Sequence, residues 1–293
     1  MNRDNNILRK TISEMILNEH SKHLLSECIV VAGQTGNQNV IAKTRDRNYK
    51  PKLKIIRTLF PNGTEVVCMH DQKTKYLEGM NSHGIGILNS TLMVYEDENP
   101  VEAGTQSDYG KAVINALMKS DIQEAIAILC DADYGIEGHT MVANADEIYV
   151  IERTGHHDTV LNKLDPSMGF DVRTNHGLKH KDAGYTMKDR PKDYVSSKIR
   201  QATAETNLVN VNNFHDVAKA MLSVPFKKSS NLNTLRRTDN LRTSSQIALN
   251  LPTKEFVFYI FPNECEFKGI EEHVPENYEP KINIKIYQWN ERN

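Results

Sequence analysis

Cysteine is scarce in this chain of 293 residues, and no two cysteines have the spacing of a metal site. The four residues are Cys28, Cys68, Cys130 and Cys265. They form no Cys-x-x-Cys or Cys/His zinc pattern, so we expect neither a bound metal nor a cofactor. Scattered cysteines in a chain of this length are typical of reduced thiols, not of a disulfide framework. We therefore expect a cytoplasmic protein.

Long apolar runs are absent as well. Near the N-terminus the longest run is Met15-Ile16-Leu17, which is too short for the core of a secretory signal. No segment approaches the roughly 20 apolar residues that span a bilayer, so we expect no contact with a membrane. The chain also lacks an excess of one charge, with 36 Lys and Arg against 38 Asp and Glu. This balance disfavours nucleic acid as a partner and leaves a homo-oligomer open.

Runs rich in Val, Ile and Thr alternate with helical patterns along the chain. The predicted strands are 28–33, 39–44, 53–60, 64–70, 84–94, 139–143, 147–152, 159–164, 244–250, 256–261 and 282–289, and the predicted helices are 109–118, 122–130, 194–206 and 214–224. This order predicts an α+β fold in which helices cover sheets. No repeat or Pro/Gly-rich boundary divides it, so we expect one domain over residues 28–293.

Residues 1–27 form an N-terminal extension in this interpretation. Leu8, Ile12 and Met15 give residues 7–25 one apolar stripe, which predicts an amphipathic helix. Two interpretations are open. The helix either packs on the body of the protein or acts as a removable cover for a site at Cys28.

Cys28 begins a strand-like run, a turn follows at Gly36-Asn37, and the returning run ends in Arg45-Asp46-Arg47. A lone cysteine at the start of a strand is most often a small buried hydrophobe, and Cys68 and Cys130 have that character. A thiol can nevertheless be activated without a histidine. If Cys28 became the first residue, its α-amino group, with a pKa near 7.7–8.0, could accept the thiol proton.

Five segments carry a resemblance to a known family. They are Cys28 with its hairpin and KTRDRNY, YLEGMNSHGIGILNSTL at 76–92, VRTNHGL at 172–178, SSKIRQA at 196–202, and RTSSQIALNLPTKEFVFYIF at 242–261. In this order they resemble the choloylglycine hydrolase family of N-terminal-nucleophile amide hydrolases, which includes penicillin V acylases and isopenicillin N acyltransferases. The resemblance implies a four-layered αββα fold of two antiparallel sheets between helices.

The resemblance also implies roles for individual residues. Cys28 would be the nucleophile, and Asn81 would donate a hydrogen bond to the oxyanion. Asn175 would orient the freed amine or add a second donor. Arg200 would support these groups or reach the substrate.

The charged cluster after the hairpin completes the implied site. Arg45 would favour the thiolate through its charge, and Asp46 would hold the amine. The family usually places its aspartate two or three residues after the arginine, near Arg47 or Asn48. Here the aspartate directly follows Arg45, so either Asp46 or Asn48 fills that position.

The function predicted from these residues is hydrolysis of a linear, non-peptide C–N amide bond in a small molecule. Cys28 would first be released by autocatalytic cleavage after Glu27. An acyltransferase that uses the same acyl-enzyme is an alternative, and so is a non-catalytic protein that is never processed. An ordinary cysteine peptidase with a histidine base is a third possibility.

Overall fold

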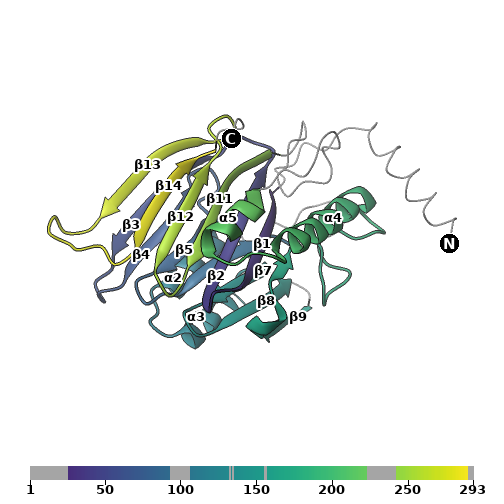
Figure 1. The fold of residues 1–293 in the computed structure, drawn as a ribbon, viewed down its shortest axis with the longest axis horizontal. Helices are drawn as coiled ribbons and strands as arrows, with labels where there is room; N and C mark the ends of the chain where they lie inside the picture. Colours follow the sequence, from purple (N-terminus) through teal and green to yellow (C-terminus); the bar gives the residue numbers. More distant parts are fainter. Residues whose placement is uncertain are drawn as a thin grey trace.

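Two β-sheets stacked face to face form the centre of the computed structural model (Figure 1). The structure describes residues 26–92, 106–131, 133, 135–154, 157–222 and 242–289. The predicted N-terminal helix at 7–25 lies outside these ranges. Within them, none of the helices is long and apolar enough to cross a membrane.

The first sheet has six strands in the order β10-β1-β2-β11-β12-β14. Their bounds are β1 (Ser26–Thr35), β2 (Gln38–Arg47), β10 (Asp171–Arg173), β11 (Arg242–Asn250), β12 (Glu255–Ile260) and β14 (Asn283–Gln288). A two-residue turn joins β1 to β2, with positive φ at both Gly36 and Asn37. Two successive positive φ angles match the twist of a tight hairpin, so the predicted turn is confirmed.

The second sheet has eight strands in the order β13-β3-β4-β5-β6-β7-β8-β9. Their bounds are β3 (Lys52–Leu59), β4 (Glu65–Asp71), β5 (Leu77–Asn81), β6 (Gly86–Ser90), β7 (Gly138–Ala143), β8 (Ile148–Thr154), β9 (His157–Lys163) and β13 (Glu266–His273). Neighbouring strands from β3 to β9 are antiparallel. The sheet therefore grows mainly by local hairpins, except at its β13 edge.

Helices cover the outer face of each sheet, which gives four layers (Figure 1). Helices α2 (Gln106–Leu117) and α3 (Ile122–Leu129) pack on the eight-stranded sheet. Helices α4 (Pro191–Leu208) and α5 (Phe214–Leu222) pack on the six-stranded sheet. A short 3₁₀ helix, η1 (Pro166–Met168), precedes β10. The predicted αββα sandwich is confirmed.

One part of the fold prediction is wrong, because the sheets are not wholly antiparallel. β14 pairs parallel with β12, and β13 pairs parallel with β3. Both pairs form at sheet edges, where a strand from the C-terminal part of the chain is added. The sequence patterns also missed the strands β5, β10 and β13, of which β10 has only three residues.

Side chains along β1 and β2 alternate between two environments. Val30, Ala32 and Ile41 face the core between the sheets, whereas Ile29 and Val31 face α4 and α5. Because successive side chains of a strand point to opposite faces, Cys28 points toward the other sheet and its neighbour Glu27 points toward the helices. The peptide bond between these two residues therefore lies in the plane of the six-stranded sheet.

Candidate active site

The Cys28 side chain is buried between the two sheets, 1% exposed. In the hairpin register Cys28 lies opposite Arg45, and three basic side chains of β2 share its face: Lys43, Arg45 and Arg47. On β4 and β5 the facing carboxylates are Asp71 and Glu78. Three basic side chains thus face two carboxylates beside the sulfur.

Arg45 and Lys43 are held mainly by the carboxylate of Glu78. Arg45 Nη1 lies 2.8 Å from Glu78 Oε1, and Lys43 Nζ lies 2.5 Å from Glu78 Oε2. Arg45 Nη2 also lies 3.4 Å from Asp71 Oδ2. Burial alone would raise the pKa of Glu78, but the two cations outweigh it and lower that pKa. The Arg45 guanidinium is therefore bound to carboxylates and not to the sulfur.

Arg47 is the arginine that contacts Cys28. Its Nη1 lies 3.7 Å from Cys28 Sγ and 3.4 Å from the carbonyl oxygen of Glu27, and it donates to the Asp46 carbonyl at 2.8 Å. Burial lowers the pKa of the Arg47 guanidinium, but Cys28, Tyr49 and Asp71 outweigh burial and raise that pKa above its usual value. This side chain therefore stays charged. One cationic donor thus lies near both the sulfur and the carbonyl of the preceding peptide bond.

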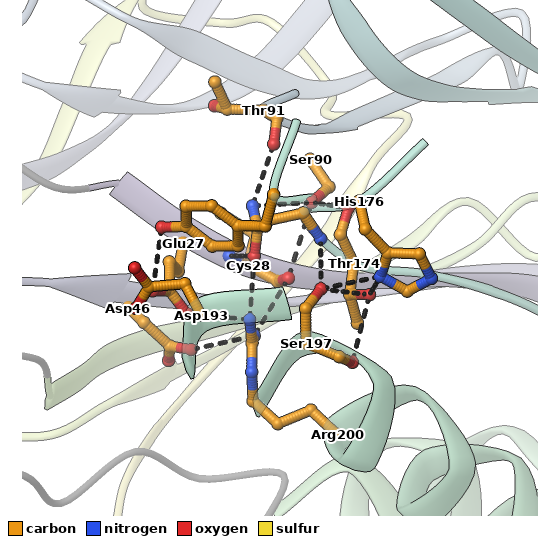
Figure 2. Close-up of polar contacts among 12 residues, drawn as sticks. Glu27, Cys28, Asp46, Ser90, Thr91, Thr174, His176, Asp193, Ser197 and Arg200 are labelled. Carbon is orange, nitrogen blue, oxygen red and sulfur yellow. Dashed lines mark hydrogen bonds and ion pairs between the residues drawn. The ribbon is translucent and has the colours of Figure 1, made fainter. Parts of the chain in front are cut away.

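The opposite face of β1 carries a second network, centred on Arg200 of α4 (Figure 2). Arg200 Nη2 binds the Glu27 carboxylate at 2.7 Å, and Nη1 binds the Cys28 carbonyl at 3.2 Å. Asp46, directly opposite Glu27 in the hairpin, lies 3.5 Å from Nη1 and accepts a 2.7 Å hydrogen bond from Thr243. Asp46 therefore lies in this network, and Asn48, just beyond β2, is half-buried.

Asn175 fixes the backbone nitrogen of Cys28. Its Oδ1 accepts from that N–H at 3.2 Å and from Arg200 Nη2 at 2.9 Å. Its Nδ2 donates to the Thr91 carbonyl at 2.8 Å, which prevents the amide from rotating. Antiparallel pairing of β10 with β1 explains this position, because Val30 lies opposite Arg173 and the two strands run on toward Asn175 and Cys28.

A buried histidine, His176, contacts the serine that holds the backbone of Asn175 (Figure 2). His176 Nδ1 lies 2.8 Å from Ser197 Oγ, and Ser197 Oγ accepts from the Asn175 N–H at 3.0 Å. Burial, with the nearby Lys198, lowers the pKa of His176 to about 3. The imidazole is therefore neutral at physiological pH.

Asn81 does not lie with the other predicted residues. Its side chain faces the α2–α3 layer, on the far face of the eight-stranded sheet from Cys28. Both N–H groups of its amide donate to backbone carbonyls at the end of α2, to Leu117 at 2.8 Å and Lys119 at 2.7 Å. Its Oδ1 accepts from the backbone of Ile85 at 2.9 Å. This placement does not support the oxyanion role and instead makes Asn81 a bridge between a turn and a helix end.

The other three cysteines are also free thiols. Burial raises the pKa of Cys68, of Cys130, and of Cys265, the last to about 11. Such thiols are poor nucleophiles at neutral pH. Over the described ranges, no group of three or more His, Cys, Asp or Glu side chains is arranged to hold a metal ion.

The structure thus brings Cys28, Asp46, Asn175 and Arg200 together. Arg45 is instead bound by Glu78 and Asp71, and Asn81 lies on the far face of the eight-stranded sheet. Sequence reasoning missed the contact of Arg47 and the part played by Tyr185, whose hydroxyl donates to Glu27 at 2.9 Å. The alternation of β2 could have indicated Arg47, since it shares a strand face with Arg45. No sequence signal marked Tyr185.

Comparison with known proteins finds weak structural likenesses. Neither a protein-family model nor a curated protein matches the chain. Among solved structures, penicillin V acylase from Agrobacterium tumefaciens matches with a TM-score of 0.43 and 14% identity, over 80% of this chain and 86% of that one. A mutant of conjugated bile acid hydrolase from Clostridium perfringens matches with a TM-score of 0.42 and 14% identity, over 80% of this chain and 89% of that one. These scores are low, so the likenesses add no weight to the site described above.

Asn81→Ala is expected to lower the free energy of unfolding by about 1–3 kcal/mol, because it leaves buried backbone groups without partners. Chemical denaturation measures this change. The control is Asn62→Ala, since Asn62 donates to the Met118 carbonyl at the same helix end but is exposed. A loss of catalytic rate without a loss of stability in Asn81→Ala would restore the oxyanion role.

The folded state is expected to lose stability as the pH falls, because His176 is held neutral in the folded chain. The unfolded chain takes up a proton at this residue near pH 6.5, whereas the folded chain does so only near pH 3. The unfolded state therefore binds more protons across this window, and the folded state loses stability as the pH falls through it. Urea unfolding between pH 7 and pH 4 should show a smaller loss in His176→Asn than in the wild type. The exposed His273→Asn is the control, and parallel profiles for all three proteins would contradict this assignment.

Proposed function

We propose that this chain is a cysteine amidase whose nucleophile is released by cleavage between Glu27 and Cys28. The contact that carries the proposal is that of Arg47, whose Nη1 lies near both Cys28 Sγ and the Glu27 carbonyl oxygen. Attack of the sulfur on this carbonyl would place negative charge on that oxygen. A charged donor already beside the oxygen stabilises the charge as it forms.

Self-cleavage would proceed in two steps. The thiol sulfur bonds to the Glu27 carbonyl carbon, the C–N bond breaks, and the thiol proton passes to the released nitrogen of Cys28. Water then hydrolyses the thioester, which frees residues 1–27 with a C-terminal carboxyl group and regenerates the thiol. The new α-amino group keeps Asn175 Oδ1 as an acceptor.

The amine would then serve as the base for external substrates. The nearby guanidinium of Arg200 disfavours a second positive charge and so favours the neutral amine. This amine takes the thiol proton, the sulfur attacks the amide carbonyl of the substrate, and the amine returns the proton to the leaving nitrogen. Water releases the acid from the thioester. An amine in place of water would make the same enzyme an acyltransferase.

Basic side chains outnumber carboxylates beside Cys28, with Lys43, Arg45 and Arg47 facing Asp71 and Glu78. Burial, together with Arg45 and Arg47, lowers the pKa of Lys43, although Cys28 and Glu78 act in the opposite direction. A negative charge that forms on the sulfur during attack would face the cations of this cluster. The thiolate is also the reactive form of cysteine.

Cys28→Ala is expected to keep its first 27 residues and to hydrolyse no amide, because it lacks the nucleophile. Intact-mass spectrometry of the purified full-length protein measures the processing, and release of p-nitroaniline from acyl anilides measures the activity. Cys265→Ala, which removes another buried thiol, should be shortened and active like the wild type. A full-length wild-type chain that turns over amides without shortening would show that the α-amine is not the base.

Arg47→Gln is expected to slow both self-cleavage and turnover by on the order of 10²-fold, since a neutral amide replaces a charged donor. It should also shift the pH profile of Cys28 alkylation by iodoacetamide to higher pH, because the thiolate loses its nearest cation. Arg242→Gln is the matched control, as Arg242 lies directly opposite Arg47 in the β2–β11 pair but is exposed. Equal rates and alkylation profiles in the two variants would remove Arg47 from the mechanism.

A further inference from the structure

The side chain of Glu27 occupies a buried site of its own, on the opposite face of the sheet from the sulfur. It is 0% exposed, although it precedes the proposed cleavage point by a single bond. Arg200 Nη2 lies 2.7 Å from Glu27 Oε2, and the Tyr185 hydroxyl donates to Oε1 at 2.9 Å. Each carboxylate oxygen therefore has its own donor, one of them charged.

The two donors are themselves rigidly placed. Arg200 projects from the buried face of α4 and also binds Asn175 Oδ1 at 2.9 Å. Tyr185 is fully buried, and the guanidinium of Arg190 stacks on its ring at 5.3 Å from the centroid. Together they form a preorganised receptor for a carboxylate, in which Tyr185 supplies the neutral donor and Arg200 the charge.

Cleavage after Glu27 would remove the carboxylate from this receptor. The Tyr185 hydroxyl and Arg200 Nη2 would then lose their contacts with this carboxylate, whereas Arg200 Nη2 would keep Asn175 Oδ1 as an acceptor. Hydrogen bonds to a carboxylate are stronger than those between neutral groups. A substrate that brings a new carboxylate to the same place would restore these charge-assisted contacts on binding.

Glu27 also defines the distance between the two ends of the acyl group. In self-cleavage its carbonyl carbon is the atom that the sulfur attacks, while its carboxylate remains bound to Arg200 and Tyr185. An unbranched acyl group with the same number of carbons between carbonyl and carboxylate is the glutaryl group. Resting on the proposed function, we infer that the mature protein hydrolyses amides of a glutaryl-like acyl group, whose distal carboxylate is held by Arg200 and Tyr185.

The reaction then balances as an ordinary amide hydrolysis. The sulfur of Cys28 bonds to the proximal carbonyl carbon while the C–N bond breaks, and the thiol proton leaves with the amine. Water cleaves the thioester and yields glutarate and the free thiol. The distal carboxylate changes neither charge nor bonding, so its contribution lies in binding and orientation.

The test uses protein expressed at full length and shown by mass to have lost its first 27 residues. Its kcat/KM is measured for glutaryl-p-nitroanilide, for the valeryl analogue, which has the same chain length without a carboxylate, and for the shorter succinyl analogue. We expect glutaryl to exceed both by at least tenfold. Tyr185→Phe should lower the ratio of the glutaryl to the valeryl kcat/KM roughly tenfold or more, because it loses one hydrogen bond to a charged group. Tyr287→Phe, at a half-exposed position on β14, is the control.

Competition offers a second measurement on the wild-type protein alone, in case Tyr185→Phe fails to fold. Glutarate should inhibit valeryl anilide hydrolysis at a concentration at least tenfold lower than valerate does. If valeryl anilide is hydrolysed as fast as glutaryl anilide and the two acids inhibit equally, the inference is wrong and the amidase function stands. If the shortened protein hydrolyses none of the anilides, the proposed function itself fails.

Discussion

The buried guanidinium of Arg200 is the group on which the site depends. It binds acceptors from three other segments of the chain, namely the Glu27 carboxylate and Cys28 carbonyl of β1, Asp46 of β2, and Asn175 after β10 (Figure 2). A buried charge without partners is strongly unfavourable. These segments must therefore come together around α4 in the folded chain, and their meeting fixes the backbone of Cys28 at both its nitrogen and its carbonyl.

The alternation of β1 divides the site between two environments. Cys28 points between the sheets, where the basic side chains of Lys43, Arg45 and Arg47 outnumber the two carboxylates that bind them. Glu27 points into the helix layer, where Arg200 is matched by two carboxylates. A single peptide bond thus joins a residue that faces a cluster of basic side chains to a residue whose carboxylate is bound in the helix layer. The proposed cleavage would open both regions to a substrate at once.

Several features of this arrangement follow from local sequence. Gly36-Asn37 predicts the tight hairpin, and the runs at 28–33 and 39–44 predict its strands, because turn chemistry and strand alternation depend on near neighbours. The motif order also identified Asn175 and Arg200, which the structure brings to Cys28. The layered fold came from the resemblance, and the coarse helix and strand order was only compatible with it.

Other features depend on contacts that no local pattern encodes. Arg45 and Arg47 lie on the same face of β2, and only the position of Glu78 and Asp71 on neighbouring strands decides which arginine reaches the sulfur. Asn81 was assigned by its motif, but the pairing of β5 turns its side chain to the helix layer.

The division between sequence and tertiary structure is therefore clear. The sequence by itself determined the hairpin, the identity of the candidate nucleophile and the order of its partners. Tertiary structure decided the parallel edge strands, the choice of Arg47 and the receptor at Tyr185. The physical reason is that side-chain direction and burial depend on strand register and on partners remote in the chain, which a sequence read along its length does not specify.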